Sequence, residues 1–159
     1  MTVENFNLPQ ADSETPFQLE NALEDNEFVV LLFQRDYFCT NCRNQVQDIN
    51  ERYDEFQGRN VELVSIIPEG LNRANSWKEK YTLRFPVVAD ADKKVSDSFN
   101  QPVKFGVLGN IHDLLGRMPL TMILDGSSRE ILYRNAGETP TDRPSVDKLL
   151  GKIDNCKNS

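Results

Sequence analysis

The sequence is poor in the residues that build metal centres and disulfide frameworks. Its 159 residues include one histidine and three cysteines, and only Cys39 and Cys42 form a closely spaced pair. The Cys39–Cys42 pair could in principle bind zinc together with Cys156 and His112. A zinc site usually has a second close pair of ligands, and the sequence has none. We therefore expect no metal. An odd number of cysteines, one of them almost at the last residue, also argues against the disulfide framework of a secreted protein.

Long apolar runs and an excess of basic residues are also missing. No stretch approaches the roughly 20 apolar residues that cross a bilayer. Residues 1–10 lack the basic and then apolar pattern of a secretory signal. We therefore expect no membrane association and a cytoplasmic location. The formal net charge of -7 disfavours binding to nucleic acid, because an acidic surface repels phosphate groups.

Apolar runs alternate with amphipathic segments along the chain, which predicts an α/β fold. Residues 28–33 form a continuous apolar run rich in β-branched and aromatic side chains, which is typical of a buried central strand. Further strands are expected at residues 61–67, 119–124 and 130–134. The last two are separated by the turn sequence Asp125-Gly126-Ser127-Ser128. This hairpin makes the expected sheet mixed.

Helices are predicted where apolar residues recur every three or four positions. One such segment predicts a single amphipathic helix over residues 42–56, closed by Gly58; its apolar positions are Val46, Ile49, Tyr53 and Phe56. Other helices are expected at residues 71–81, 94–99 and 144–153. We therefore expect one domain over residues 1–159, with a central mixed β-sheet flanked by helices.

The candidate reactive centre is the dithiol Cys39-Thr40-Asn41-Cys42. It follows the buried strand and opens a helix, where backbone N–H groups lack partners and the helix dipole favours negative charge. The thiolate is the reactive form of cysteine, and such a position lowers the thiol pKa. The spacing also lets the two sulfurs close a disulfide, so we expect one thiolate to attack and the other to resolve.

Residues around the two cysteines are candidates for tuning their chemistry. Arg35 and Arg43 flank the dithiol and are candidates for stabilising a thiolate, although a solvated position on the helix surface is the alternative for Arg43. Thr40 and Asn41 lie between the sulfurs and are expected to influence the redox potential. The redox-active cysteine pair is expected to work without a bound cofactor.

Six segments carry a family resemblance: residues 5–9, 29–42, 61–67, 77–81, 85–90 and 119–126. In this order they resemble the AhpC/TSA branch of the thioredoxin-like superfamily, which includes the peroxiredoxins. The resemblance covers nearly the whole chain and implies a thioredoxin-like fold with antioxidant thiol chemistry. It also implies that Pro119, which opens a predicted strand, is a cis-proline facing the active-site sulfurs.

The resemblance leaves the attacking cysteine open. Peroxiredoxins carry the pattern Pro-x-x-x-Thr/Ser-x-x-Cys, and their peroxidatic cysteine falls on Cys42. In this alignment Cys39 stands where the family has its threonine, and Arg35 stands where it has its proline. Pro119 stands where the family has an arginine on a later strand. In thioredoxin-like dithiol proteins the first cysteine attacks, which is Cys39 here. The chain therefore resembles a peroxiredoxin body with a thioredoxin-type site.

Three functions are compatible with these features. In the first, a thiol–disulfide oxidoreductase, Cys39 attacks a substrate disulfide, Cys42 resolves it and Pro119 shapes the substrate groove. In the second, a thiol-dependent peroxidase, Cys42 is oxidised to a sulfenic acid and Cys39 condenses with it. The third is a non-enzymatic redox sensor. Expected partners are protein or small-molecule disulfides or peroxides and a reducing thiol system, and we expect a monomer or homodimer.

Overall fold

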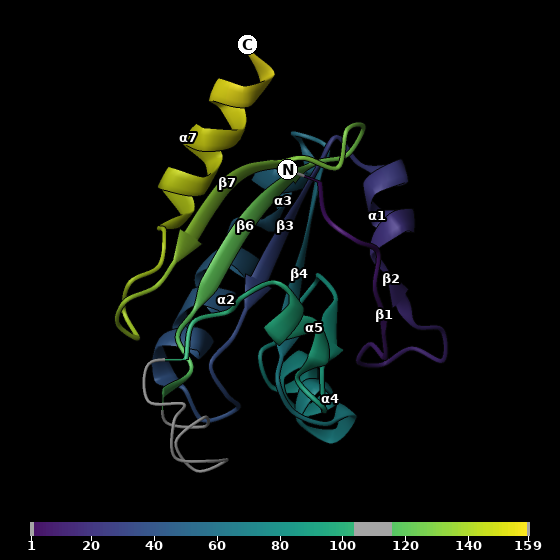
Figure 1. Cartoon of the computed structure of the whole chain (residues 1–159), viewed down its shortest axis with the longest axis vertical. Helices are drawn as coiled ribbons and strands as arrows, with labels where there is room; N and C mark the ends of the chain where they lie inside the picture. The colour runs from purple at the N-terminus through teal and green to yellow at the C-terminus, as the bar shows by residue number, and fades with distance from the viewer. Residues whose placement is uncertain (1, 104–115, 159) are drawn as a thin grey trace.

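The computed structural model describes residues 2–103 and 116–158. At its centre is a mixed five-stranded sheet with the order β5-β4-β3-β6-β7 (Figure 1). The middle strand, β3 (Phe28–Phe33), pairs in parallel with β4 (Val61–Ile67) and antiparallel with β6 (Leu120–Asp125). The edges are β5 (Val87–Ala89) and β7 (Ile131–Ala136). The predicted mixed sheet is confirmed, with the predicted buried strand at its centre.

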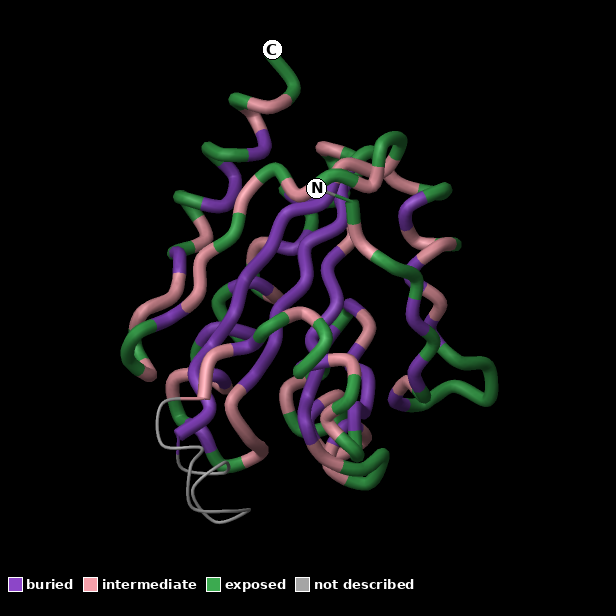
Figure 2. The backbone as a smooth tube through the Cα atoms, in the orientation of Figure 1, coloured by how far each residue is buried: buried purple, intermediate pink, exposed green. Residues whose placement is uncertain are grey.

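Helices and an N-terminal hairpin cover the two faces of this sheet (Figures 1 and 2). One face of β3 packs through Val30 and Leu32 against a core that includes four helices: α2 (Thr40–Glu51), α3 (Tyr53–Gln57), α4 (Leu71–Lys80) and α7 (Val146–Lys157). The other face packs through Val29 and Leu31 against the segments β1 (Asn7–Leu8), β2 (Phe17–Gln18), α1 (Leu19–Asp25) and α5 (Lys94–Ser98). Within the described ranges, no helix has both the length and the apolar character needed to cross a membrane.

The helix predicted over residues 42–56 is wrong in two respects. It begins earlier, because Cys39 caps α2 and Thr40 is its first residue. It is also divided, because Arg52 leaves the helical region with φ -111° and ψ 19°, and α3 starts anew after it. The Arg52 guanidinium binds both Glu55 and Asp147. The pair with Asp147 links the junction between the two helices to α7, and the pair with Glu55 links it to α3.

Pro119 precedes β6, but the expected cis peptide bond is wrong: the Met118–Pro119 bond is trans. The Pro119 carbonyl accepts a hydrogen bond of 2.8 Å from the Gly137 N–H. The proline ring also packs closely on Gly137, where an added Cβ would lie 2.7 Å from the ring. Proline is tolerated at the start of a strand because no N–H is needed for pairing there, so a trans proline satisfies this position.

Candidate active site

The two cysteines of the dithiol lie at the first turn of α2, just beyond the end of β3, as predicted. Cys39 is the N-cap residue of α2, and its Sγ accepts a hydrogen bond of 3.2 Å from the backbone N–H of Cys42. The Cys39 side chain is 5% exposed, whereas Cys42 is fully buried in the core. The outer sulfur is therefore the more accessible of the pair.

The surroundings of the two sulfurs separate their acidities. The pKa of Cys39 is lowered to about 6, first by a hydrogen bond from the Cys42 thiol and further by the Cys42 backbone N–H, Arg35 and Arg143. Burial raises the pKa of Cys42, and the neighbouring Cys39 adds to this effect. The two thiols interact directly, and their surroundings favour the thiolate form of Cys39 and the neutral form of Cys42.

Two arginines approach the sulfurs from different segments. The Nη1 atom of Arg35 lies 3.7 Å from Cys39 Sγ, and its backbone N–H donates to Cys42 Sγ at 3.4 Å. The Nη2 atom of Arg143 lies 3.3 Å from Cys42 Sγ. Arg35 was a predicted site residue, whereas Arg143 was missed. It lies in the loop between β7 and α7, and no sequence motif connects it with the dithiol.

Buried glutamines hold the Arg143 guanidinium in place. Its Nη1 atom donates to Gln45 Oε1 at 3.0 Å and to Gln34 Oε1 at 3.4 Å. Gln34 is fully buried and donates in turn to Ser65 Oγ on β4 at 3.1 Å. Arg143 is thus oriented by groups from α2 and the sheet. These glutamines were also missed, because a single buried glutamine has no recognisable spacing.

Arg43 has a different role from the one expected. Its Nε donates to the Tyr37 carbonyl at 2.9 Å, and its guanidinium lies over the Tyr37 ring at 4.8 Å from the centroid. The structure gives it no contact with either sulfur within the described residues. Arg43 therefore supports the loop before the dithiol. Of the two residues between the cysteines, Thr40 is exposed and Asn41 is partly buried.

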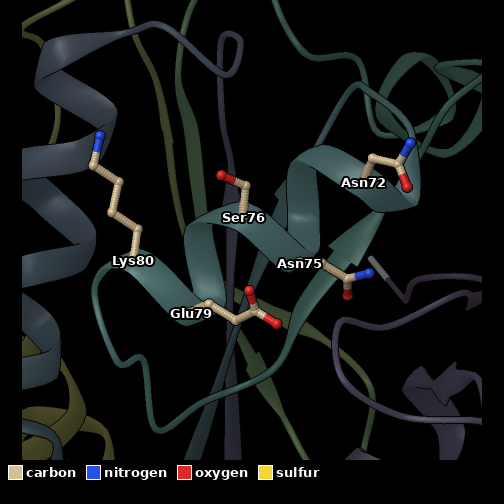
Figure 3. Close-up of a pocket in the computed structure, with 5 residues that line it drawn as sticks. All are labelled: Asn72, Asn75, Ser76, Glu79 and Lys80. Atoms are coloured by element: carbon tan, nitrogen blue, oxygen red, sulfur yellow. The ribbon is translucent and has the colours of Figure 1, made fainter.

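Tyr37 anchors that loop to α4. Its hydroxyl lies 2.6 Å from Ser76 Oγ, its carbonyl accepts from Trp77 Nε1 at 3.1 Å, and its backbone N–H donates to Glu69. Ser76 also lines a polar pocket on α4 (Figure 3). This pocket contains neither cysteine, so we do not assign the chemistry to it. The anchoring leaves Phe38, next to Cys39, 68% exposed.

The third cysteine lies far from the dithiol. Cys156, on α7, lines a pocket with Phe28 and Asp125, which lie at the opposite end of the sheet from the dithiol. His112 lies outside the described residues. Within residues 2–103 and 116–158, no three His, Cys, Asp or Glu side chains gather in a group suited to a metal ion.

The thioredoxin-like arrangement, with a Cys-x-x-Cys pair between the central strand and its helix, defines a dithiol protein of the thioredoxin-like class. The sequence profile of the AhpC/TSA family matches residues 2–126. The match covers most of the chain, including both cysteines, and the chain belongs to this family.

Two relatives illustrate the similarity. The structure of peroxidoxin BcpB from Mycobacterium tuberculosis superposes with a TM-score of 0.82 at 26% identity, covering 98% of this chain and 95% of that one. Peroxiredoxin 2 of Picrophilus torridus is 28% identical over 81 residues, which are 47% of this chain and 40% of that protein. This chain therefore matches about two-fifths of the length of that curated relative.

A more distant structure supports the fold alone. The reduced 2-Cys peroxiredoxin of Plasmodium vivax has a TM-score of 0.80 at 17% identity, covering 99% of this chain and 94% of that one. At this level of identity the similarity extends to the order of strands and helices.

Proposed function

We propose that the protein is a thiol-dependent peroxidase that reduces hydroperoxides with its Cys39–Cys42 dithiol. The observation that carries the proposal is the setting of the dithiol: the Arg35 guanidinium lies 3.7 Å from Cys39 Sγ, the Arg143 guanidinium lies 3.3 Å from Cys42 Sγ, and the pKa of Cys39 is lowered. Membership of the AhpC/TSA family supports it, as do relatives named peroxidoxin and peroxiredoxin. Of the functions considered from the sequence, the peroxidase is the one these observations favour.

In the proposed reaction, the Cys39 thiolate attacks the terminal oxygen of a hydroperoxide and the O–O bond breaks. Cys39 becomes a sulfenic acid, and the departing alkoxide takes the proton of the Cys42 thiol to leave as an alcohol. The resulting Cys42 thiolate attacks the sulfenic sulfur, and an S–S bond forms. Hydroxide leaves and takes a proton from solvent, so one hydroperoxide yields one alcohol, one water and one disulfide.

The assignment of Cys39 as the attacking sulfur reverses the roles implied by the peroxiredoxin pattern. It is based on the lowered pKa of Cys39 and on the complete burial of Cys42. The thiolate is the nucleophilic form, so we propose that the sulfur whose surroundings favour the thiolate reacts first. In single-cysteine variants, dimedone should trap a sulfenic acid at Cys39 in Cys42→Ser faster than at Cys42 in Cys39→Ser; the reverse order would restore the peroxiredoxin assignment.

The two arginines have a direct part in this chemistry. Negative charge develops on the leaving oxygen as the O–O bond breaks, and fixed cationic donors stabilise such charge most where water is excluded. Arg35 and Arg143 both lie within 4 Å of a sulfur, at 3.7 Å and 3.3 Å respectively. They are therefore placed to stabilise both the thiolate and the departing alkoxide.

Turnover requires a reductant for the Cys39–Cys42 disulfide. We propose that a reducing thiol system supplies these electrons by thiol–disulfide exchange. Such a cycle fits a reducing compartment, so the cytoplasm is the proposed location. The protein is proposed to act as a monomer or a homodimer.

The decisive measurement is stopped-flow consumption of hydrogen peroxide and an alkyl hydroperoxide by the reduced protein. Wild type should consume peroxide far faster than free cysteine and accumulate an intramolecular disulfide. The Cys39→Ser/Cys42→Ser double variant should be inactive and serves as the control. Consumption by wild type at the rate of free cysteine would refute the peroxidase.

A disulfide oxidoreductase is the second candidate. The pairing of an outer thiolate at Cys39 with a buried thiol at Cys42 favours it, because this arrangement suits attack on a disulfide and subsequent resolution. This hypothesis was also based on a cis-proline at position 119, and the peptide bond before Pro119 is trans. Rapid reduction of insulin disulfides, together with peroxide consumption no faster than that of free cysteine, would favour this second function.

A further inference from the structure

Gln101 is a buried side chain that has no part in the proposed reaction. It follows α5, and only 5% of it is exposed. Its backbone N–H donates to the Ser96 carbonyl at 3.1 Å, which fixes its position relative to the helix. Burying a polar amide is costly unless its groups are hydrogen-bonded. The partners of this amide therefore show which parts of the chain it holds in place.

The Gln101 amide joins the chain just after β3 to the chain just before β6. Its Nε2 donates to the Gln34 carbonyl at 2.9 Å and to the Met118 carbonyl at 2.9 Å. Its Oε1 accepts from Arg117 Nη1, also at 2.9 Å. The two carbonyls require a donor and the guanidinium requires an acceptor, so these contacts fix the orientation of the amide. Both amide hydrogens are therefore used to hold backbone carbonyls.

The Gln34 carbonyl belongs to the same peptide group as the Arg35 N–H, which donates to Cys42 Sγ at 3.4 Å. This peptide bond is trans, and a planar trans peptide directs its C=O and N–H in opposite directions. An anchored carbonyl therefore sets the direction of the N–H. Donation from Gln101 also polarises the peptide group, which makes its N–H a stronger donor to the sulfur.

The Arg35 side chain is held by a separate contact. Its Nε donates to the Arg117 carbonyl at 2.7 Å. That carbonyl shares a peptide group with the Met118 N–H, which donates to the Pro102 carbonyl at 2.8 Å. The guanidinium, which approaches the other sulfur, is thus anchored on the backbone, whereas the direction of the Arg35 N–H depends on the Gln101 amide.

We propose that Gln101 is a positioning residue for the resolving thiol, an inference that rests on the proposed function. The Cys42 thiolate carries the charge in the step that forms the S–S bond, and a hydrogen bond from the Arg35 N–H stabilises that charge. Gln101 keeps this N–H directed at the sulfur through the peptide group between them. Loss of the amide should slow the attack by Cys42 and leave the first attack, by Cys39, unchanged.

A small neutral disulfide separates the two attacks without any peroxide. In a Cys156→Ser background, Cys39 attacks dipyridyl disulfide and releases one thiopyridone, and Cys42 then attacks the mixed disulfide and releases a second. Gln101→Met removes the amide at similar volume. It should slow the second release by about tenfold, the size of one hydrogen bond, while the first release keeps its rate. A second release as fast as in the wild type would overturn the proposal.

Two further variants separate this role from a general loosening of the fold. Ser96→Ala removes another buried hydrogen bond, from Ser96 Oγ to Asp90 at 2.7 Å, but leaves the Gln34 carbonyl bound, so both releases should keep their rates. Gln101→Glu keeps an acceptor for Arg117 but loses the amide donors. It should also slow the second release, and it carries the test if the methionine variant does not fold. Equal slowing by Ser96→Ala, or a wild-type rate in Gln101→Glu, would contradict the assignment.

NMR gives a readout that depends on no reaction. In the reduced protein, the backbone amide proton of Arg35 should move upfield in Gln101→Met, because its hydrogen bond to Cys42 Sγ weakens, and it should stay in place in Ser96→Ala. This shift, together with a slower second release, supports the role of Gln101 even if the protein consumes no peroxide. Rapid peroxide consumption with an unmoved Arg35 amide in Gln101→Met would overturn this role and leave the peroxidase intact.

Discussion

At the scale of single residues, the dithiol shows how two identical thiols a helical turn apart acquire different chemistry. Cys39 caps the helix, where the Cys42 N–H and thiol both donate to its sulfur, and these donors stabilise its thiolate. Cys42 lies behind it in the core, where desolvation favours the neutral thiol. These surroundings favour the proton on the inner sulfur, where the proposed reaction uses it to protonate the leaving oxygen.

The lowered pKa of Cys39 predicts a pH profile. Because its thiolate forms as pH rises through about 6, iodoacetamide should alkylate Cys39 with an inflection near that pH, and the rate should fall at lower pH. Cys42→Ala removes the hydrogen bond that contributes most to the shift, so the inflection should move upward. Cys42→Ser retains an O–H donor and should move it less. An inflection at the ordinary thiol pKa of about 8.5 in wild type would contradict this account.

Arg143 gives a second prediction at this scale. Replacing it with alanine removes a cationic donor 3.3 Å from Cys42 Sγ, and we expect kcat/KM for peroxide to fall by about 100-fold, as for loss of one preorganised donor. Arg143→Lys retains the charge but not the planar fork and should recover part of the activity. An unchanged rate in Arg143→Ala would exclude the arginine from the reaction.

At the scale of elements, local pattern predicted strands more accurately than helices. The continuous apolar run at β3 and the mainly apolar run at β4 gave the observed bounds, since such runs are buried on both sides of a sheet. The α2–α3 break at Arg52 was missed, because it accompanies ion pairs with Glu55 and Asp147 on neighbouring helices. A periodic pattern that continues through the junction cannot reveal such contacts.

The turn between β6 and β7 provides a test of one element. A Cβ on Gly126 would lie 2.1 Å from the Asn26 carbonyl and 2.7 Å from that of Leu23. Gly126→Ala should therefore lower the free energy of unfolding by about 2–3 kcal/mol, the usual cost of overpacking. The control is Gly151→Ala on α7, where the added Cβ meets nothing within 4 Å.

The control has the opposite expected sign. Alanine at position 151 should raise the free energy of unfolding by about 0.5–1 kcal/mol, because alanine loses less conformational entropy than glycine in a helix. Urea unfolding curves of the two variants and wild type measure both effects. Equal stabilities for Gly126→Ala and wild type would show that the turn moves to accept the extra carbon.

At the scale of the whole molecule, the sheet separates the chemistry from the third thiol. The dithiol follows the end of β3, whereas Cys156 lies near Phe28, where that strand begins. Six residues of strand span about 20 Å, which is far beyond the 2 Å of an S–S bond. Cys156 therefore has no path to the dithiol within the folded chain.

This separation predicts that Cys156 takes no part in turnover. Cys156→Ser should leave the rate of peroxide consumption unchanged. After one equivalent of peroxide, mass spectrometry should find the Cys39–Cys42 disulfide and an alkylatable Cys156 in the wild type. A disulfide that includes Cys156, or a slower variant, would contradict the prediction.

The sequence by itself determined the main strands and the position of the dithiol, because these depend on residues that are neighbours along the chain, and it determined the family through six segments in a shared order. The tertiary structure decided the rest of the site. Arg143 reaches Cys42 across 101 positions, Gln45 orients it, and Pro119 takes a trans bond that packs against Gly137. Such contacts form only when the sheet and helices have packed, so no local pattern along the chain contains them.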